Sequence, residues 1–297
     1  MKKFIVILLT SLFILAGCTA KPDPEIKPVK VMAPAGAPAL SLINYVKERG
    51  TDYVTVSQGA DALQAELLNP NSEFDAIVAP INLGATLITK KGAEWSLAGV
   101  VTWGNLYLVC NEALKDSGKD VALFGESAVP GKVVGALDLK FTQNVKWYSA
   151  VSEASAALLS GDASYALLAE PVLTATLAKA KQNSLTVTVV SDLQEEFNKK
   201  YGTSGYPQAA LFVSNKALKE KKGDIDELIR VISSLQAADV KTIEGNESFY
   251  GVPAAAVVEK AFSGMNVRYQ AAKDCEKEIG AFLKLFGITD FSNIIVK

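Results

Sequence analysis

The strongest constraint on the fold is a repeated unit of helix, turn, buried strand and proline. One copy spans 61–80 and ends at Pro80, and the other spans 153–171 and ends at Pro171. Elsewhere short apolar runs such as 53–56 alternate with helical patterns. Such alternation forms βαβ units and a mainly parallel sheet. The sequence therefore predicts an α/β fold with two lobes of similar construction.

A second repeat, Val-x-Asn-x-Ala-Leu, occurs at 109–114 and at 213–218. Each copy predicts a strand that ends at an asparagine, Asn111 or Asn215, which caps the next helix. If both copies mark crossings between lobes, two strands form a hinge that allows rigid-body closure. The predicted lobes are then lobe 1 (residues 29–106 and 212–297) and lobe 2 (residues 107–211).

The beginning of the chain has the pattern of a secretory signal. Lys2 and Lys3 precede the apolar run 4–15, which is shorter than the roughly 20 residues that span a bilayer. Cys18 directly follows Leu-Ala-Gly, which is similar to a bacterial lipobox, in which the cysteine is acylated and becomes the new N-terminus. The alternative is an ordinary signal with an incidental cysteine. We expect three segments: a signal peptide (1–17), a lipidated Cys18, and a proline-punctuated tether (18–28).

The composition excludes several classes of function. A net charge of −2 over 297 residues does not supply the concentrated basic surface that nucleic acid requires. The chain has no histidine, which excludes Ser-His-Asp and Cys-His catalysis and any histidine-ligated metal. Carboxylate, lysine and tyrosine chemistry remains open. Cys110 and Cys275 could pair in an oxidising compartment, but their apolar contexts favour two buried thiols.

The order of several short motifs resembles the ABC-importer binding proteins for nitrate, taurine, alkanesulfonates and thiamine-pyrimidine precursors. The resemblance covers nearly the whole chain after the tether. It implies a type II periplasmic-binding-protein fold, with two lobes around a ligand cleft, a two-strand hinge, no catalytic activity and no cofactor or metal. The motifs are residues 32–38, 79–83, 102–105, 168–171, 204–208 and 263–269.

The resemblance also implies partners and a location. The partners are a small-molecule ligand and the permease and ATPase of an ABC importer. The protein would be a monomer held through the lipid on Cys18 at the outer face of the cytoplasmic membrane. Two alternatives stay open: a sensor lipoprotein that is not coupled to transport, and a pyrimidine-synthesising enzyme on the same fold. That enzyme chemistry uses histidine, which this chain lacks.

In such a fold the ligand lies where strand-to-helix loops of the two lobes face one another. Gly36 and Ala37 follow the first strand and open a helix, where free N–H groups could hold an anion or a polar ring edge. Gln58 and Gly59 follow the second strand. Asn82 follows the third strand at a predicted N-cap position. These residues are the first candidates for ligand binding.

The hinge supplies further candidates. Thr102 and Trp103 end the fourth strand, where the indole either stacks on a flat ligand or packs at the hinge. Tyr206 precedes the return crossing and either lines the cleft or braces a turn.

The ligand loop of lobe 2 is predicted at Gly125, Glu126 and Ser127, which follow an apolar strand. Glu170 ends another strand, so its carboxylate lies either in the cleft or at a helix start that favours negative charge.

The candidate residues favour a neutral or cationic heteroaromatic ligand, such as a thiamine-type pyrimidine, lined by Trp103, Tyr206 and Glu170. A nitrate- or sulfonate-type anion held by helix N-termini is the alternative. A bidentate arginine clamp is not expected, because no arginine lies in a predicted cleft loop. The arginines are Arg49, Arg230 and Arg268.

The predicted lipidation can be tested in the producing cell. Replacing Cys18 by serine removes the thiol that would carry the lipid, so Cys18→Ser should move the protein from the membrane fraction to the soluble fraction and abolish palmitate labelling. Fractionation and radiolabelled palmitate measure both effects. Palmitate labelling that persists in the variant would contradict the prediction.

Overall fold

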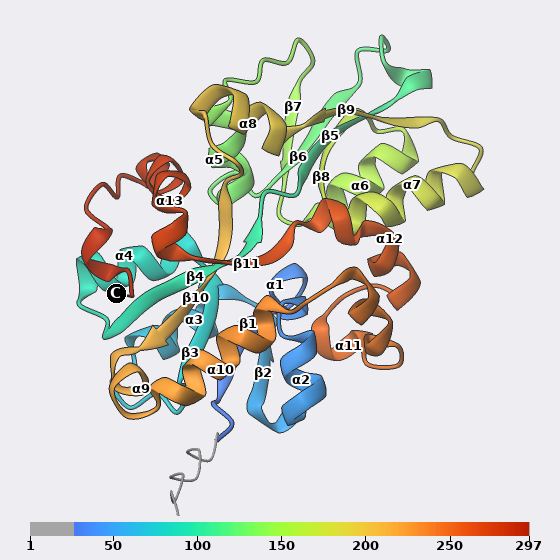
Figure 1. The fold of residues 1–297 in the computed structure, drawn as a ribbon. Coiled ribbons are helices and arrows are strands. Elements are labelled where there is room, and N and C mark those ends of the chain that lie inside the picture. Colours follow the sequence, from blue (N-terminus) through green and yellow to red (C-terminus); the bar gives the residue numbers. More distant parts are fainter. Residues whose placement is uncertain (1–26, 297) are drawn as a thin grey trace, which may run out of the picture.

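The computed structural model describes residues 27–296. The predicted signal peptide, Cys18 and residues 19–26 of the predicted tether lie outside this range. No helix in the described part of the chain is long and apolar enough to cross a membrane. The chain forms two lobes, each with its own sheet, and Figure 1 shows lobe 2 above lobe 1.

Lobe 1 contains a six-stranded sheet in the order β11-β4-β10-β3-β1-β2. Its strands are β1 (Val31–Pro34), β2 (Val54–Ser57), β3 (Ala76–Pro80), β4 (Trp95–Trp103), β10 (Pro207–Ser214) and β11 (Val267–Ala271). Its helices are α1 (Ala37–Leu40), α2 (Ile43–Arg49), α3 (Ala60–Leu68), α4 (Ile81–Lys91), α9 (Asn215–Glu220), α10 (Lys222–Ser233), α11 (Glu247–Tyr250), α12 (Ala255–Met265) and α13 (Glu276–Leu283). Short 3-10 helices are η1 (Thr51–Tyr53), η3 (Ala237–Ile243), η4 (Ala272–Asp274), η5 (Lys284–Phe286) and η6 (Ser292–Ile294).

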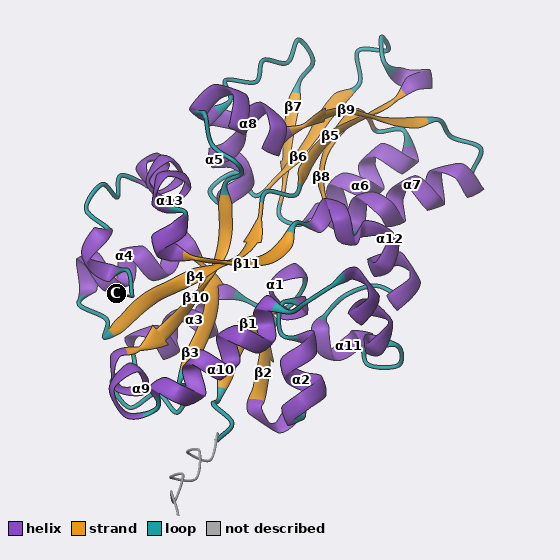
Figure 2. Ribbon diagram, viewed as in Figure 1, coloured by secondary structure: helices purple, strands orange, loops and turns teal. Residues whose placement is uncertain are grey.

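Lobe 2 contains a five-stranded sheet in the order β7-β6-β8-β5-β9. Its strands are β5 (Leu106–Asn111), β6 (Asp120–Phe124), β7 (Val145–Tyr148), β8 (Ala163–Ala169) and β9 (Val187–Asp192). Its helices are α5 (Val129–Ala136), α6 (Val151–Ser160), α7 (Val172–Gln182) and α8 (Leu193–Tyr201), and η2 (Glu112–Leu114) is a 3-10 turn. Figure 2 shows helices against both sheets.

The two lobes share one topology. In lobe 1, β1 pairs in parallel with β2 and β3, and in lobe 2, β6 pairs in parallel with β7 and β8. In each lobe one strand is inserted antiparallel beside the third strand: β10 beside β3, and β5 beside β8. The helix-strand repeat appears as α3 with β3 and as α6 with β8. The predicted α/β fold with two similar lobes is confirmed.

The return crossing lies earlier than the sequence predicted. The chain first crosses between lobes at 104–105 and returns at 202–206, between α8 and β10. All of β10 pairs within the sheet of lobe 1, so residues 207–211 belong to lobe 1 and not to lobe 2. Leu106 likewise belongs to β5 of lobe 2. The predicted boundary was wrong because the Val-x-Asn repeat marks the far ends of β5 and β10, not the crossings.

The two copies of that repeat also cap their helices differently. Asn111 caps η2 as predicted, because its side chain accepts the N–H of Ala113. In the second copy the cap is Ser214, whose side chain accepts the N–H of Ala217. The Oδ1 of Asn215 instead accepts a hydrogen bond from the hydroxyl of Ser96 at 2.7 Å.

The largest apolar cluster runs from one lobe into the other through the hinge. It includes side chains of β3, β4 and β10 in lobe 1 and of β6, α5 and α8 in lobe 2. Cys110 and Cys275 are both buried and unpaired, which confirms the prediction of two buried thiols. Burial raises the pKa of Cys275 to about 12, so its thiol is not a ready nucleophile.

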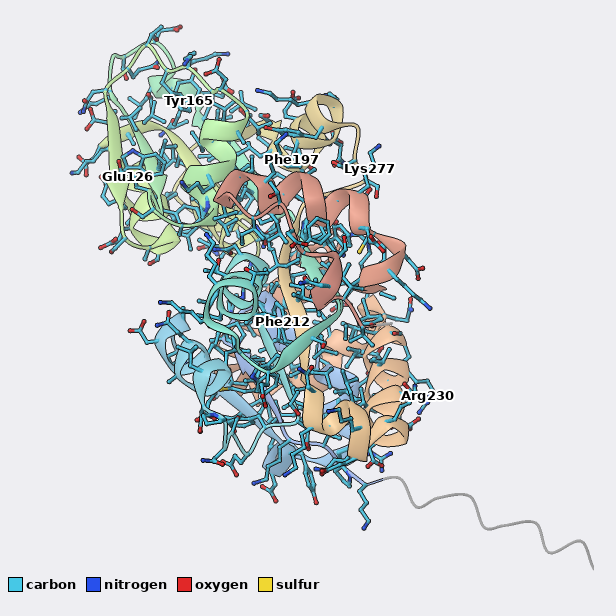
Figure 3. All side chains as sticks on the ribbon, turned by 90° about the vertical axis from the view of Figure 1, so that its left-hand side faces the viewer. Glu126, Tyr165, Phe197, Phe212, Arg230 and Lys277 are labelled. Carbon is cyan, nitrogen blue, oxygen red and sulfur yellow. The ribbon has the colours of Figure 1, made fainter. Side chains whose placement is uncertain are left out.

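Helix α4 packs closely on the sheet of lobe 1 at Gly84. A Cβ at Gly84 would lie 2.2 Å from Cζ of Phe212, which Figure 3 labels in lobe 1. Gly84→Ala should lower the free energy of unfolding by about 1–3 kcal/mol, because this clash outweighs the better helix propensity of alanine. Denaturant unfolding measures the change.

A helical glycine without such a neighbour is the matched control. A Cβ at Gly135 in α5 meets no atom within 4 Å, so Gly135→Ala should stabilise the protein by about 0.5–1 kcal/mol. If both variants changed stability in the same direction, the close contact at Gly84 would not explain the result.

Candidate functional site

The first candidate turn, after β1, is held by the protein itself. Gly36 has a φ of 95°, which favours glycine, and its N–H donates to the carbonyl of Tyr250 at 2.8 Å. The N–H of Ala35 donates to the backbone carbonyl of Ser57 at 2.8 Å. Ala37, which follows Gly36, is buried. The expectation that Gly36 has a free N–H for an anion is therefore wrong. The ligand contact predicted for Ala37 stays a prediction.

Two turns that face solvent carry exposed candidates. Gln58 and Gly59, between β2 and α3, are exposed, as are Glu126 and Ser127 between β6 and α5. Gly125 closes the second turn, since its N–H donates to the carbonyl of Tyr148 and its own carbonyl accepts from the N–H groups of two later residues. Figure 3 shows Glu126 at one side of lobe 2 and Phe197 at the other, next to α13.

Asn82 lies in the first turn of α4 and does not cap it. The N-cap is Pro80, because the helix begins at Ile81 directly after β3. The predicted capping role of Asn82 is therefore wrong. Its Oδ1 is buried and has no hydrogen-bond partner among the described residues. A buried acceptor without a partner is costly, so this oxygen is suited to a donor that a ligand brings.

Thr102 and Trp103 are part of the hinge packing. The Oγ1 of Thr102 accepts the N–H of Ala209 at 3.1 Å, where the β4–β10 pairing is irregular. Trp103 is fully buried, and the guanidinium carbon of Arg268 lies 4.4 Å from the centre of its ring. In this arrangement the indole stacks on Arg268 and has no free face for a ligand. Of the two roles foreseen for Trp103, the structure favours the packing one.

Tyr206 is also fully buried, at the return crossing. Its ring stacks on Phe282 of α13 with centroids 5.6 Å apart, and it lies 5.1 Å from the ring of Phe197 in α8. A Cβ on Gly104 would lie 2.4 Å from the Tyr206 ring, so the two crossings touch only because this residue is glycine. Tyr206 therefore braces the hinge and does not line an open cleft.

For Glu170 the sequence predicted either a place in the ligand cleft or a place at the start of a helix, and the structure shows the contacts of the second. Its carboxylate accepts the backbone N–H of Thr174 at 3.0 Å and the hydroxyl of Thr174 at 2.9 Å, so it serves the start of α7. Its backbone N–H donates to the carbonyl of Asn105 at the first crossing, and the bond to Pro171 is cis. Burial raises the pKa of the Glu170 carboxyl, and the hydrogen bonds from Thr174 oppose that shift.

Sequence reasoning missed a polar network on the other side of the hinge. The hydroxyl of Tyr107 donates to the carbonyl of Gly264 at 3.0 Å, and Nδ2 of Asn266 donates to the carbonyl of Gly104 at 2.6 Å. Asn266 has a φ of 51°, a conformation that asparagine tolerates better than most residues. An asparagine just after a helix was the only local signal of this network.

Metal ligation finds no support in the described part of the chain. Within residues 27–296 no group of three or more histidine, cysteine, aspartate or glutamate side chains could hold a metal ion.

No family model and no curated protein matches this sequence. Solved structures do match. An ABC transporter protein from Parabacteroides distasonis is 23% identical, with a TM-score of 0.69 over 86% of this chain and 91% of that one. A zinc-bound ligand-binding component of an ABC-type import system from Staphylococcus aureus is 12% identical, with a TM-score of 0.61 over 91% of this chain and 96% of that one.

A third match is the periplasmic aliphatic sulphonate binding protein of Escherichia coli, which is 14% identical, with a TM-score of 0.57 over 91% of this chain and 92% of that one. At these identities the similarity shows the fold. The chain has the two-lobed type II periplasmic-binding-protein fold that the sequence predicted.

The raised pKa of Glu170 predicts a definite pH dependence of stability. Because the folded protein holds this proton more tightly than the unfolded chain, the stabilisation is fully present below pH 4.5 and is lost as the pH rises through the raised pKa. The unfolding free energy of the wild type should therefore fall relative to Glu170→Gln over that interval. Urea unfolding between about pH 4 and pH 7 measures it.

Carbon NMR of the Glu170 carboxyl measures its pKa independently of protein stability. Thr174→Val removes the hydroxyl that donates to the carboxylate, so it should raise the pKa of Glu170 further. A titration of Glu170 at or below pH 4.5 in the wild type would contradict the assignment.

Proposed function

We propose that this protein is the extracytoplasmic solute-binding component of an ABC importer, lipid-anchored through Cys18. The observation that carries the proposal is the pair of lobes with corresponding order over five strands, joined by two crossings, with strand-to-helix turns of both lobes at the carboxyl ends of their strands. Ligands of open α/β sheets bind at such ends. The predicted export signal and the named neighbours support the same function.

Transport would follow from closure of the lobes. A ligand held by turns of both lobes binds the closed form more tightly than the open form, and this difference in affinity shifts the population toward closure. The two crossings, at 104–105 and 202–206, are short enough to act as the hinge. The permease would then recognise the closed form and the ATPase would drive release.

We propose a neutral or cationic ligand, of which a thiamine-pyrimidine-like heteroaromatic is one example. The candidate residues other than Thr102, Trp103 and Tyr206 contain two carboxylates, Glu126 and Glu170, and no lysine or arginine. Asn82 adds an unpaired acceptor, which also favours a ligand with N–H donors. Trp103 and Tyr206 no longer support stacking on the ligand. Among the other candidates, Gln58, Gly59, Glu126 and Ser127 are exposed, whereas Asn82, Gly125 and Glu170 are half-buried.

The other functions receive less support. None of the neighbours described above is named as an enzyme, and histidine-dependent chemistry is excluded by the composition. An anionic ligand, suggested by the name of the Escherichia coli neighbour, would have to bind beside Glu126 and Glu170 without a cationic partner in those turns.

Thermal unfolding against a ligand panel tests the function and the ligand class together. Pyrimidine precursors, taurine, alkanesulfonates and nitrate are compared, each over a range of concentration. A true ligand at about 100 times its dissociation constant stabilises the protein by roughly 2.7 kcal/mol. We expect the stabilisation with the pyrimidines. Stabilisation by the anions alone would overturn the ligand class while leaving the binding function in place.

A variant pair locates the site. Glu126→Gln removes a charge from the exposed turn of lobe 2 and should weaken binding of a cationic pyrimidine by about ten-fold. Glu220→Gln, at the end of α9 in lobe 1, removes the same charge away from the candidate turns and should leave binding unchanged. Equal affinities in the two variants would exclude Glu126 from the site.

A further inference from the structure

Helix α12 belongs to lobe 1 but reaches lobe 2. Its residues follow η3 and α11 in the chain and precede β11, the edge strand of the lobe 1 sheet. The helix packs against η3 in its own lobe and against α7 in the other. Figure 1 shows α12 directly beneath α7, on the side of the molecule away from α13.

The end of α12 packs tightly against side chains of lobe 2. The carbonyl of Gly264 accepts the hydroxyl of Tyr107 on β5 at 3.0 Å. A Cβ on Gly264 would lie 3.0 Å from that same hydroxyl oxygen and 3.2 Å from Cγ of Glu170. Both neighbours belong to lobe 2, so the contact exists only while the lobes hold this arrangement.

The residues just after α12 hold the first crossing. Asn266 donates from Nδ2 to the carbonyl of Gly104, and its own carbonyl accepts the N–H of Trp103 at 3.1 Å. Asn105, which follows Gly104 in the first crossing, donates from its side chain to the carbonyl of Glu170 at 3.2 Å. The segment 264–266 is thus bonded both to lobe 2 and to the chain that leads into it.

The turns that carry the exposed candidate residues make no such hydrogen bond to the other lobe within the described part of the chain. Gln58, Gly59, Glu126 and Ser127 are exposed, and they lie in turns that follow β2 and β6. The lobes are thus bonded to each other through Tyr107 at the α12 rim, and the return crossing is bonded to α13 through Gly202 and Ser204. The turns 58–59 and 125–127 are exposed.

We propose that Tyr107, Gly264 and Asn266 form a latch that fixes one rim of the interface between the lobes and limits how far they open. Opening at this rim breaks the bond from Tyr107 to Gly264 and leaves that carbonyl, at the end of α12, with only the longer 3.4 Å hydrogen bond from Nδ2 of Asn266. Opening at the turns 58–59 and 125–127 breaks no such bond. The latch therefore resists opening at the α12 rim and holds the lobes of the ligand-free protein together there.

The test measures the distance between the lobes without any ligand. Spin labels are attached through Gln58→Cys and Ser127→Cys in the chain with Cys18→Ser, where the remaining thiols, Cys110 and Cys275, are buried. Pulsed electron paramagnetic resonance then gives the distribution of distances. Because no ligand is present, the result does not depend on whether the proposed transport function is right.

Two variants break the latch in different ways. Tyr107→Phe removes only the hydroxyl, and Gly264→Ala inserts a Cβ that forces the side chains of Tyr107 and Glu170 to shift. Loss of one hydrogen bond should raise the ratio of long to short distances by roughly five-fold. Gly135→Ala, a helical glycine with no neighbour within 4 Å, is the control and should leave the distribution unchanged.

The distance distributions of the three variants decide whether the latch exists. A shift toward longer distances in Tyr107→Phe and in Gly264→Ala, but not in Gly135→Ala, supports the latch. Wild-type distributions in Tyr107→Phe overturn it, and so does an equal shift in the control. If Gly264→Ala does not fold, Tyr107→Phe decides the question alone, because it removes one oxygen and adds no atom.

Discussion

The structure depends most on the aromatic packing at the return crossing. Tyr206 lies between Phe197 of lobe 2 and Phe282 of lobe 1, so one buried ring joins the cores of both lobes. Apolar burial of this kind is the main stabilising contribution in a protein, and offset or tilted aromatic pairs add to it. Gly104 allows the first crossing to lie against Tyr206. The two lobes are therefore parts of one continuous core and not separate domains on a flexible linker.

This packing also decides what the aromatic residues near the hinge do. Trp103 is covered by Arg268 on one face of its ring and is fully buried, so its contribution is to the hinge. The polar candidates outside the hinge packing include Asn82, whose buried oxygen in the first turn of α4 is unpaired, and Glu126, which lies in an exposed turn. Closure of the lobes around a ligand, as proposed, would have to occur by small rotations of the two crossings.

Much of the fold was predictable because it is written in local pattern. Alternating apolar runs and helical periods identify α3, β3, α6 and β8 directly, and the repeated proline after each strand shows that the lobes share a construction. The return crossing was misplaced because a strand that enters from another lobe has the same local pattern as one that does not. The N-cap of α4 was misassigned to Asn82 because Pro80 already ends β3 and caps the helix.

The α/β class, the two similar lobes, the buried thiols of Cys110 and Cys275 and the exclusion of histidine chemistry could all be predicted from the amino-acid sequence, since they follow from composition and short-range periodicity. The burial of Tyr206 at the hinge and the bond from Tyr107 to Gly264 could be found only in the folded chain. Burial and hydrogen bonding at the hinge bring together residues about 80 to 160 positions apart. No local pattern in a single sequence encodes which of those residues meet.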